Sequence, residues 1–144
     1  MDQIDSKILS LMHENARIPI SEMSRMIAMS QPAVTERLRK LEEQGVITGY
    51  RAKLSPRKLG KQTTAFVLFK TNDCKGFAAF SEKSPEIVDL YRISGEYNFL
   101  MKVLSETTES LTDFLDECSA FGFSTTLIVL STAFEDKSLV TSEL

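Results

Sequence analysis

The spacing of apolar residues changes once along the 144 residues of this chain, and the change limits the folds open to it. Before Gly45 the apolar residues recur every three or four positions, as they do on one face of an α-helix. Beyond Gly60 they recur every second position over short runs, as in β-strands, and helical spacing returns between the runs. The chain therefore predicts two domains of different class, one over residues 1–61 and one over residues 62–144.

Three helices are expected in the amino-terminal domain. Asp2 can cap a first helix that runs to about residue 15, and Ser21 is placed to cap a short second one. Ser30 can cap a third helix, which tolerates Pro32 in its first turn and ends at Gly45. A tight turn over residues 28–30 separates the last two helices, which is typical of a helix-turn-helix.

Extended spacing over residues 46–54 predicts a short strand and linker between the domains. The carboxy-terminal domain then predicts strands over residues 63–71, 87–94, 97–104 and 125–134. Helices are expected over residues 75–83 and from Thr107 or Thr108 to Gly122. This order is that of a ferredoxin-like βαββαβ domain with both helices on one face of the sheet. The predicted fold class is therefore α+β, a three-helix helix-turn-helix domain joined to a ferredoxin-like domain.

The net charge of −3 conceals two domains of opposite charge. Residues 1–61 hold 11 basic and 7 acidic residues, a net charge of +4, whereas residues 62–144 hold 6 and 13, a net charge of −7. Between Arg25 and Lys58 there are eight basic residues and three acidic ones. The first domain is thus suited to meet a polyanion, and the second repels one.

The third helix has the side chains that read DNA bases. Val34, Leu38 and Leu41 define its buried stripe, which directs another set of residues outward or onto the flank. That set is expected at base edges in the major groove of double-stranded DNA: Gln31, Pro32, Ala33, Thr35, Glu36, Arg39 and Lys40.

Each of these side chains has a matching base contact. Arg39 can donate two parallel hydrogen bonds to guanine, Gln31 can pair with adenine, and Glu36 can accept from cytosine. Ala33 or Thr35 can contact the thymine methyl group. Four basic residues are better assigned to phosphates, where they add affinity without sequence choice: Arg25, Lys40, Arg51 and Lys53. Arg37 lies to one side of the stripe and is expected in a salt bridge within the domain.

Other functions find little support. The only histidine, His13, has no metal-ligand spacing around it, and no phosphate-binding glycine motif is present, so we expect neither an enzyme nor a cofactor. The aromatic run from residue 65 to 69 falls on the wrong strand for an RNA-recognition motif and in the acidic domain. The apolar runs are too short to cross a bilayer, and the amino terminus does not read as a secretion signal, so we expect a cytoplasmic protein.

Motifs along the whole chain resemble the Lrp/AsnC family of transcription regulators, also called feast/famine regulators. They are Ile4-Asp5 with Ile8-Leu9, Ile20-Ser21-Glu22-Met23-Ser24, Ser30-x-x-x-Val34-x-x-Arg37-Leu38-x-x-Leu41-Glu42-x-x-Gly45-Val46-Ile47, Lys58-Leu59-Gly60 and Ser94-Gly95-Glu96-Tyr97-Asn98. The resemblance implies a regulator that pairs into dimers through its ferredoxin-like domain, with four dimers in an octamer. Two paired recognition helices would reach half-sites about 34 Å apart, or a multiple of that spacing, on near-palindromic DNA.

The resemblance also implies a small effector, commonly an amino acid, bound between dimers near the loop that joins the second and third strands. Here the implied residues are Ile93, Gly95, Glu96, Tyr97 and Asn98. The family pattern in this loop is Gly-x-x-Asp, and this chain has Asn98 in place of the acid. An amide carries no full charge for a ligand ammonium group, although it still accepts a hydrogen bond. Two alternatives stay open: an effector-responsive regulator, and an architectural DNA-binding protein without an effector.

Overall fold

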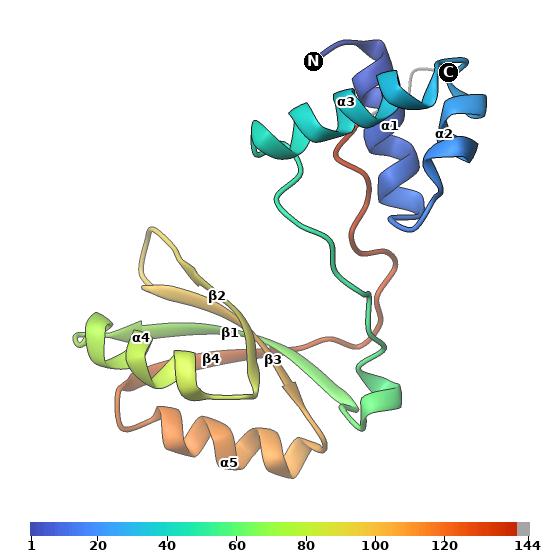
Figure 1. Cartoon of the computed structure of the whole chain (residues 1–144). Coiled ribbons are helices and arrows are strands. Elements are labelled where there is room, and N and C mark those ends of the chain that lie inside the picture. The colour runs from blue at the N-terminus through green and yellow to red at the C-terminus, as the bar shows by residue number, and fades with distance from the viewer. Residues whose placement is uncertain (141–144) are drawn as a thin grey trace. The chain divides into compact units, whose positions relative to one another are not determined.

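The computed structural model describes residues 1–140 and divides into two compact units. The first, called the helical unit, comprises residues 1–53 and the returning segment 134–140; the second, called the sheet unit, comprises residues 54–133. Figure 1 shows helices alone in the first unit and a sheet with helices in the second. Within residues 1–140, no helix combines the length and the apolar character that a membrane span requires.

The helical unit contains α1 (Gln3–Glu14), α2 (Ile20–Met26) and α3 (Gln31–Glu43). The predicted caps Asp2 and Ser30 are confirmed, since the Asp2 carboxylate accepts from the Asp5 amide at 2.9 Å and the Ser30 hydroxyl accepts from the Ala33 amide at 3.4 Å. Gly45 follows α3 with a φ of +69°, in the left-handed region that favours glycine. The expected cap Ser21 is wrong. The helix already begins at Ile20, because the Pro19 carbonyl accepts the first helical hydrogen bonds.

A small core joins the three helices of this unit. Ile8, Met23, Val34 and Leu41 are almost completely buried, and half-buried apolar residues surround them. The salt bridge expected of Arg37 is confirmed, because its Nη1 lies 2.8 Å from both Asp2 Oδ2 and Asp5 Oδ1. Arg37 thereby ties the start of α1 to α3.

The segment after α3 differs from the prediction. No strand forms over residues 46–54, because no other described strand pairs with them, and Val46, Tyr50 and Leu54 are exposed. A single 3-10 turn, η1 (Arg57–Leu59), precedes the sheet and ends at Gly60.

The sheet unit runs β1 (Thr63–Thr71), α4 (Cys74–Lys83), β2 (Ile87–Arg92), β3 (Phe99–Ser105), α5 (Thr108–Cys118) and β4 (Gly122–Ile128). Its antiparallel strands lie in the order β2-β3-β1-β4, which confirms the predicted fold class. The last strand begins three residues earlier than predicted and ends at Ile128. The expectation that Gly122 ends the preceding helix is wrong, because α5 already ends at Cys118 and Gly122 is the first residue of β4. A Cβ at this position would lie 2.0 Å from the Lys70 carbonyl oxygen, so the close approach to β1 requires glycine.

Both helices pack on the same face of the sheet, as Figure 1 indicates. Alternate residues of β1 and β3, among them Val67, Phe69 and Met101, are buried there. Phe77 on α4 stacks on Phe69 with ring centroids 4.0 Å apart. The side chains between them in sequence therefore lie on the opposite face of the sheet, which neither helix covers.

Candidate DNA-binding surface and effector loop

The amino-terminal half of α3 carries a shallow open hollow on its exposed surface. Its lining residues are four of those predicted at base edges: Gln31, Pro32, Thr35 and Glu36. All four are exposed, whereas Ala33 is half-buried and donates its amide to the Ser30 cap. The Thr35 hydroxyl donates to the Gln31 carbonyl at 2.9 Å, within the helix. The sequence thus located this group of residues correctly on one accessible surface.

Arg39 lies next to this hollow, and all three of its guanidinium nitrogens have carboxylate partners. Its Nε donates to Glu36 Oε2 at 3.0 Å and its Nη2 to Glu36 Oε1 at 2.7 Å. Its Nη1 donates to Glu43 Oε1. These contacts lower the pKa of Glu36 below its ordinary value and raise that of Arg39. The expected guanine-reading side chain is thus paired with acids on its own helix.

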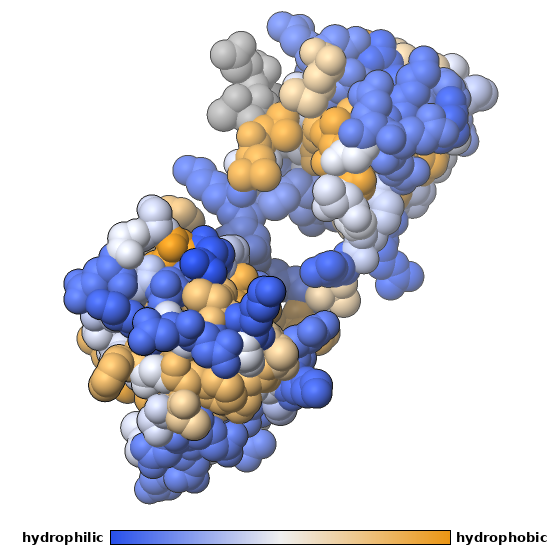
Figure 2. Space-filling model, turned by 90° about the vertical axis from the view of Figure 1, so that its left-hand side faces the viewer, coloured by the Kyte–Doolittle hydropathy of each residue, from blue (hydrophilic) through white to orange (hydrophobic). Residues whose placement is uncertain are grey.

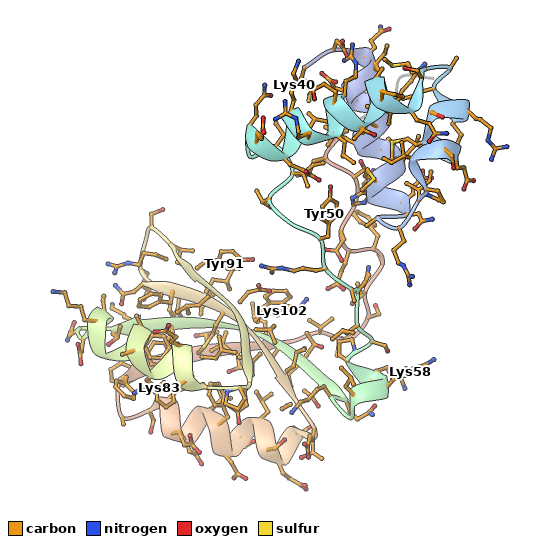
Figure 3. The ribbon with its side chains drawn as sticks, in the orientation of Figure 1. Lys40, Tyr50, Lys58, Lys83, Tyr91 and Lys102 are labelled. Carbon is orange, nitrogen blue, oxygen red and sulfur yellow. The ribbon has the colours of Figure 1, made fainter. Side chains whose placement is uncertain are left out.

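The residues assigned to phosphates occupy separate parts of the helical unit. Lys40 projects from α3 in Figure 3 and lies 3.8 Å from Glu36 Oε1, while Arg25 is exposed in the last turn of α2. Arg51 is exposed beyond α3, and Lys53 Nζ lies 3.1 Å from Asp136 Oδ2 in the returning segment. The structure therefore brings Glu36, Arg39 and Lys40 together. No hydrogen bond or ion pair identified among the described residues joins the other three to that group.

The sequence did not identify two of these partners. Glu43 lies four residues beyond Arg39 on a helix, a spacing that predicts contact and could have located it. Asp136 is far from Lys53 in the sequence, and nothing in the pattern pairs the two. A third contact fixes the segment after α3, where the Tyr50 hydroxyl donates to Glu42 Oε1 at 2.6 Å. Partial desolvation of the Tyr50 side chain and the bond to this glutamate raise the pKa of Tyr50 to about 12.

The expected effector loop, residues 93–98, joins β2 to β3. Two hydrogen bonds join its last residue, Asn98, to β1. The backbone N–H of Asn98 donates to the Phe69 carbonyl at 2.8 Å, and the side-chain oxygen Asn98 Oδ1 accepts from the backbone N–H of Thr71 at 2.6 Å. The Ile93 amide donates to the Asn98 carbonyl at 2.9 Å, which closes the loop. Gly95 takes a φ of +104°, which a residue with a side chain rarely adopts.

A second contact holds the loop at its other side, since the Tyr97 hydroxyl and Thr125 Oγ1 on β4 lie 2.8 Å apart. Gly95 and Glu96 are exposed between these anchors. A hollow of about 320 Å³ is lined in part by Thr71, and its other lining residues come from the end of β1, the turn before α4, the turn before β4 and the start of β4. The described residues contain no group of three or more metal-liganding side chains.

Three helices around a small core, with a tight turn before a helix that exposes polar and charged side chains, are typical of a helix-turn-helix DNA-binding protein. A family model for winged helix-turn-helix DNA-binding domains matches residues 1–48, and one for the Lrp/AsnC ligand-binding domain matches residues 64–139. The chain belongs to the Lrp/AsnC family of transcription regulators, which confirms the resemblance in its sequence.

Relatives extend over nearly the whole chain. It is 42% identical over 133 residues to the uncharacterized HTH-type transcriptional regulator YezC of Bacillus subtilis, covering 92% of this chain and 96% of YezC. The structure of LrpC from B. subtilis has a TM-score of 0.89 at 29% identity and covers 93% of this chain and 97% of LrpC. The regulator NMB0573 of Neisseria meningitidis, in complex with L-Met, has a TM-score of 0.86 at 27% identity and covers 94% and 93%.

Proposed function

We propose that this regulator binds double-stranded DNA with sequence preference through the exposed surface of α3. The observation that carries the proposal is the hollow lined by Gln31, Pro32, Thr35 and Glu36, with Arg39 adjacent to it on the same helix. These side chains include donors and acceptors that can distinguish base pairs in the major groove. Residues 1–61 form the DNA-binding domain in this proposal, and residues 62–144 form the assembly and effector domain.

Four basic residues, Arg25, Lys40, Arg51 and Lys53, supply the phosphate contacts in this proposal. All four are exposed in the helical unit. Because their contacts would release counterions from DNA, they predict affinity that falls steeply with salt.

The uncovered face of the sheet supports assembly into dimers. The strand registers place Tyr91, Leu100, Leu68 and Thr125 in one row across this face, and Lys102, Phe66 and Leu127 in the next. Tyr91 is 53% exposed, Leu127 53% and Phe123 80%. Figure 2 shows hydrophobic residues at the surface of this unit among charged ones, and in Figure 3 Tyr91 and Lys102 project from the sheet. An apolar face of this kind is typical of a protein interface.

A second copy of the chain is the expected occupant of that face, and four such dimers would form an octamer. Two-fold pairing would present two copies of α3 to half-sites about 34 Å apart, or a multiple of that distance. We place this activity in the cytoplasm, where DNA is accessible.

An amino acid is the proposed effector, bound near residues Ile93, Gly95, Glu96, Tyr97 and Asn98. The L-Met complex of the N. meningitidis relative supports this ligand class. No cofactor or metal enters the proposal. One observation favours the alternative, an architectural protein without an effector. Asn98 Oδ1 accepts from the backbone N–H of Thr71, so the Asn98 side chain has a structural role whether or not a ligand binds.

The experiment that tests DNA recognition is selection of binding sites from random duplexes, followed by mobility shift at increasing salt. We expect near-palindromic sites and an affinity that falls linearly with salt on logarithmic axes. Arg39→Ala should reduce the preference for the selected site, whereas Lys40→Ala should weaken all sequences alike. Equal binding to all duplexes by the intact chain, or a preference unchanged by Arg39→Ala, would contradict the proposal.

Calorimetric titration with the twenty amino acids distinguishes an effector-responsive regulator from an architectural protein. Heat of binding with one of them supports an amino-acid effector, whereas no heat with any of them favours the architectural role.

A further inference from the structure

We propose that the two glutamates paired with Arg39 have opposite effects on DNA recognition: Glu36 orients the arginine toward a base, and Glu43 competes with DNA for it. The inference rests on the proposed function of α3 and deepens it. It makes Glu36 a positioning residue as well as a candidate base contact, and it gives Glu43 a role that the sequence did not indicate.

The geometry of the guanidinium group separates the two acids. Glu36 accepts from Nε and Nη2 in a fork, which uses one edge of the planar group. The other edge, with one N–H of Nη1 and one of Nη2, can still donate the parallel pair that guanine O6 and N7 accept. Glu43 accepts from Nη1, one of the two nitrogens of that edge, so its carboxylate lies against the nitrogen that a base also requires. The Glu36 fork is compatible with guanine reading, whereas the Glu43 contact opposes it.

The positions of the two acids along α3 agree with this division. Glu36 lines the hollow at the amino-terminal half of the helix and fixes the guanidinium beside it. Glu43 is the last residue of α3, one turn beyond Arg39 and outside the lining of that hollow. A carboxylate at this end of a helix is disfavoured by the helix dipole.

DNA can displace Glu43 from Arg39 at a small cost in free energy. The side chains of Arg39 and Glu43 are 50% and 58% exposed, and ion pairs between exposed side chains are weak and screened by salt. Displacing Glu43 leaves its carboxylate in water, without a buried charge. The fork to Glu36 retains two parallel bonds on one rigid edge, so it holds the guanidinium plane while the other edge changes partner.

The chain offers a matched control in Glu42. This residue is the immediate neighbour of Glu43, carries the same charge at the same end of α3, and accepts from Tyr50 instead of Arg39. Glu42→Gln and Glu43→Gln each remove one negative charge near the phosphates. A purely long-range charge effect would therefore raise DNA affinity to the same extent in both variants.

The experiment measures the affinity of each variant for the duplex selected by the intact chain, and for the same duplex with single guanines replaced. We expect Glu43→Gln to bind the selected duplex roughly 3–10 times more tightly than Glu42→Gln does, with discrimination kept, since a neutral amide oxygen bonds the guanidinium more weakly than a carboxylate and is displaced more easily. We expect Glu36→Gln to lose about tenfold in discrimination at one guanine, because an amide has a single oxygen and cannot accept the fork.

A second variant separates orientation from charge. Glu36→Asp keeps the negative charge but is one methylene shorter, so it should lose discrimination as Glu36→Gln does. Lysine cannot form the two parallel hydrogen bonds that Arg39 donates to Glu36. In an Arg39→Lys background, Glu36→Gln should therefore have no further effect on discrimination. Circular dichroism of each variant confirms that α3 remains folded.

The outcomes separate this inference from the proposed function. No duplex preference in the intact chain, or full preference in Arg39→Lys, overturns the proposed base contact and the inference with it. Preference that depends on Arg39, together with equal affinities for Glu42→Gln and Glu43→Gln, or with discrimination unchanged in Glu36→Asp, overturns the inference and leaves the proposed function standing.

Discussion

The helical unit and the sheet unit divide core and surface in opposite ways. The helical unit has four buried apolar residues in its core and exposes polar and charged side chains on α3. The sheet unit has ten buried core residues, aromatic rings among them, and still exposes apolar side chains on its uncovered face. The first unit therefore exposes polar side chains on a helix that a small apolar core holds in place. The second has a larger core and leaves apolar side chains exposed on the uncovered face of its sheet, where we propose that another copy of the chain binds.

The charges of the two regions follow the same division. The net charge of +4 over residues 1–61 favours binding to DNA, whereas the net charge of −7 over residues 62–144 repels DNA from that part of the chain. Within the helical unit, however, Glu36, Glu43 and Asp136 are paired with the cations expected to contact DNA. A net charge alone therefore overstates how many cations are free to meet phosphates or bases.

The largest effect is expected from Phe77→Ala in the sheet unit. The Phe77 ring is fully buried and lies 4.0 Å from Phe69 and 5.2 Å from Phe99, measured between ring centroids. Loss of a buried aromatic ring costs about 3–5 kcal/mol of the free energy of unfolding. Amide hydrogen exchange read by segment should show the loss of protection in residues 54–133. Met23→Ala is the control, since it should lower protection in the helical unit, and equal loss in both units from either variant would contradict the division.

The next largest effect concerns assembly. Leu68→Glu places a charge on the uncovered face of the sheet, where it would have to be buried in a dimer, and should weaken association by about 100-fold or more. Ala78→Glu introduces the same side chain on the exposed surface of α4 and should leave association unchanged. Sedimentation equilibrium measures both variants. Dimers that persist in Leu68→Glu would exclude this face as the interface.

Local sequence rules predicted the elements that depend on near neighbours. The caps Asp2 and Ser30, the left-handed Gly45 and the alternation of β1 follow from residues close in sequence, and all are present. The strand expected over residues 46–54 is absent, because a strand depends on a partner elsewhere in the chain.

The same limit applies to the candidate site. The spacing along α3 predicted its exposed surface, since helical geometry alone determines which residues share a face. It did not predict that Arg39 is paired with acids or that Asn98 is bonded to Thr71. A list of outward residues gives their chemical types, whereas their hydrogen-bond partners depend on rotamers and on segments distant in sequence.

A smaller effect is expected at Asn98 in the sheet unit, where the side-chain oxygen holds the loop before β3 to β1. Asn98→Asp keeps an oxygen that accepts from the Thr71 amide, so stability at neutral pH should change by less than about 1 kcal/mol. Asn98→Leu leaves that part-buried amide without its partner and should cost about 1–3 kcal/mol. Urea unfolding followed by circular dichroism measures both. If Asn98 instead acts only on a ligand, the two variants should have the same stability.

The smallest effect is expected from pH, and it should be confined to the helical unit. The Asp5 amide and Arg37 hold the pKa of Asp2 below its ordinary value of 3.8. The folded chain then binds fewer protons than the unfolded chain at mildly acidic pH, so these contacts stabilise the fold above pH 3.8 and are lost as the pH falls through the lowered pKa. Asp2→Asn should remove this part of the pH dependence in residues 1–53 and leave the sheet unit unaffected. Because Asp2 is exposed, the change should be small, and segment-resolved hydrogen exchange between about pH 5 and pH 2.5 can detect it against the unchanged sheet unit. A profile in Asp2→Asn identical to that of the intact chain would mean that the capping box and the Arg37 contact do not hold α1 to α3 in solution.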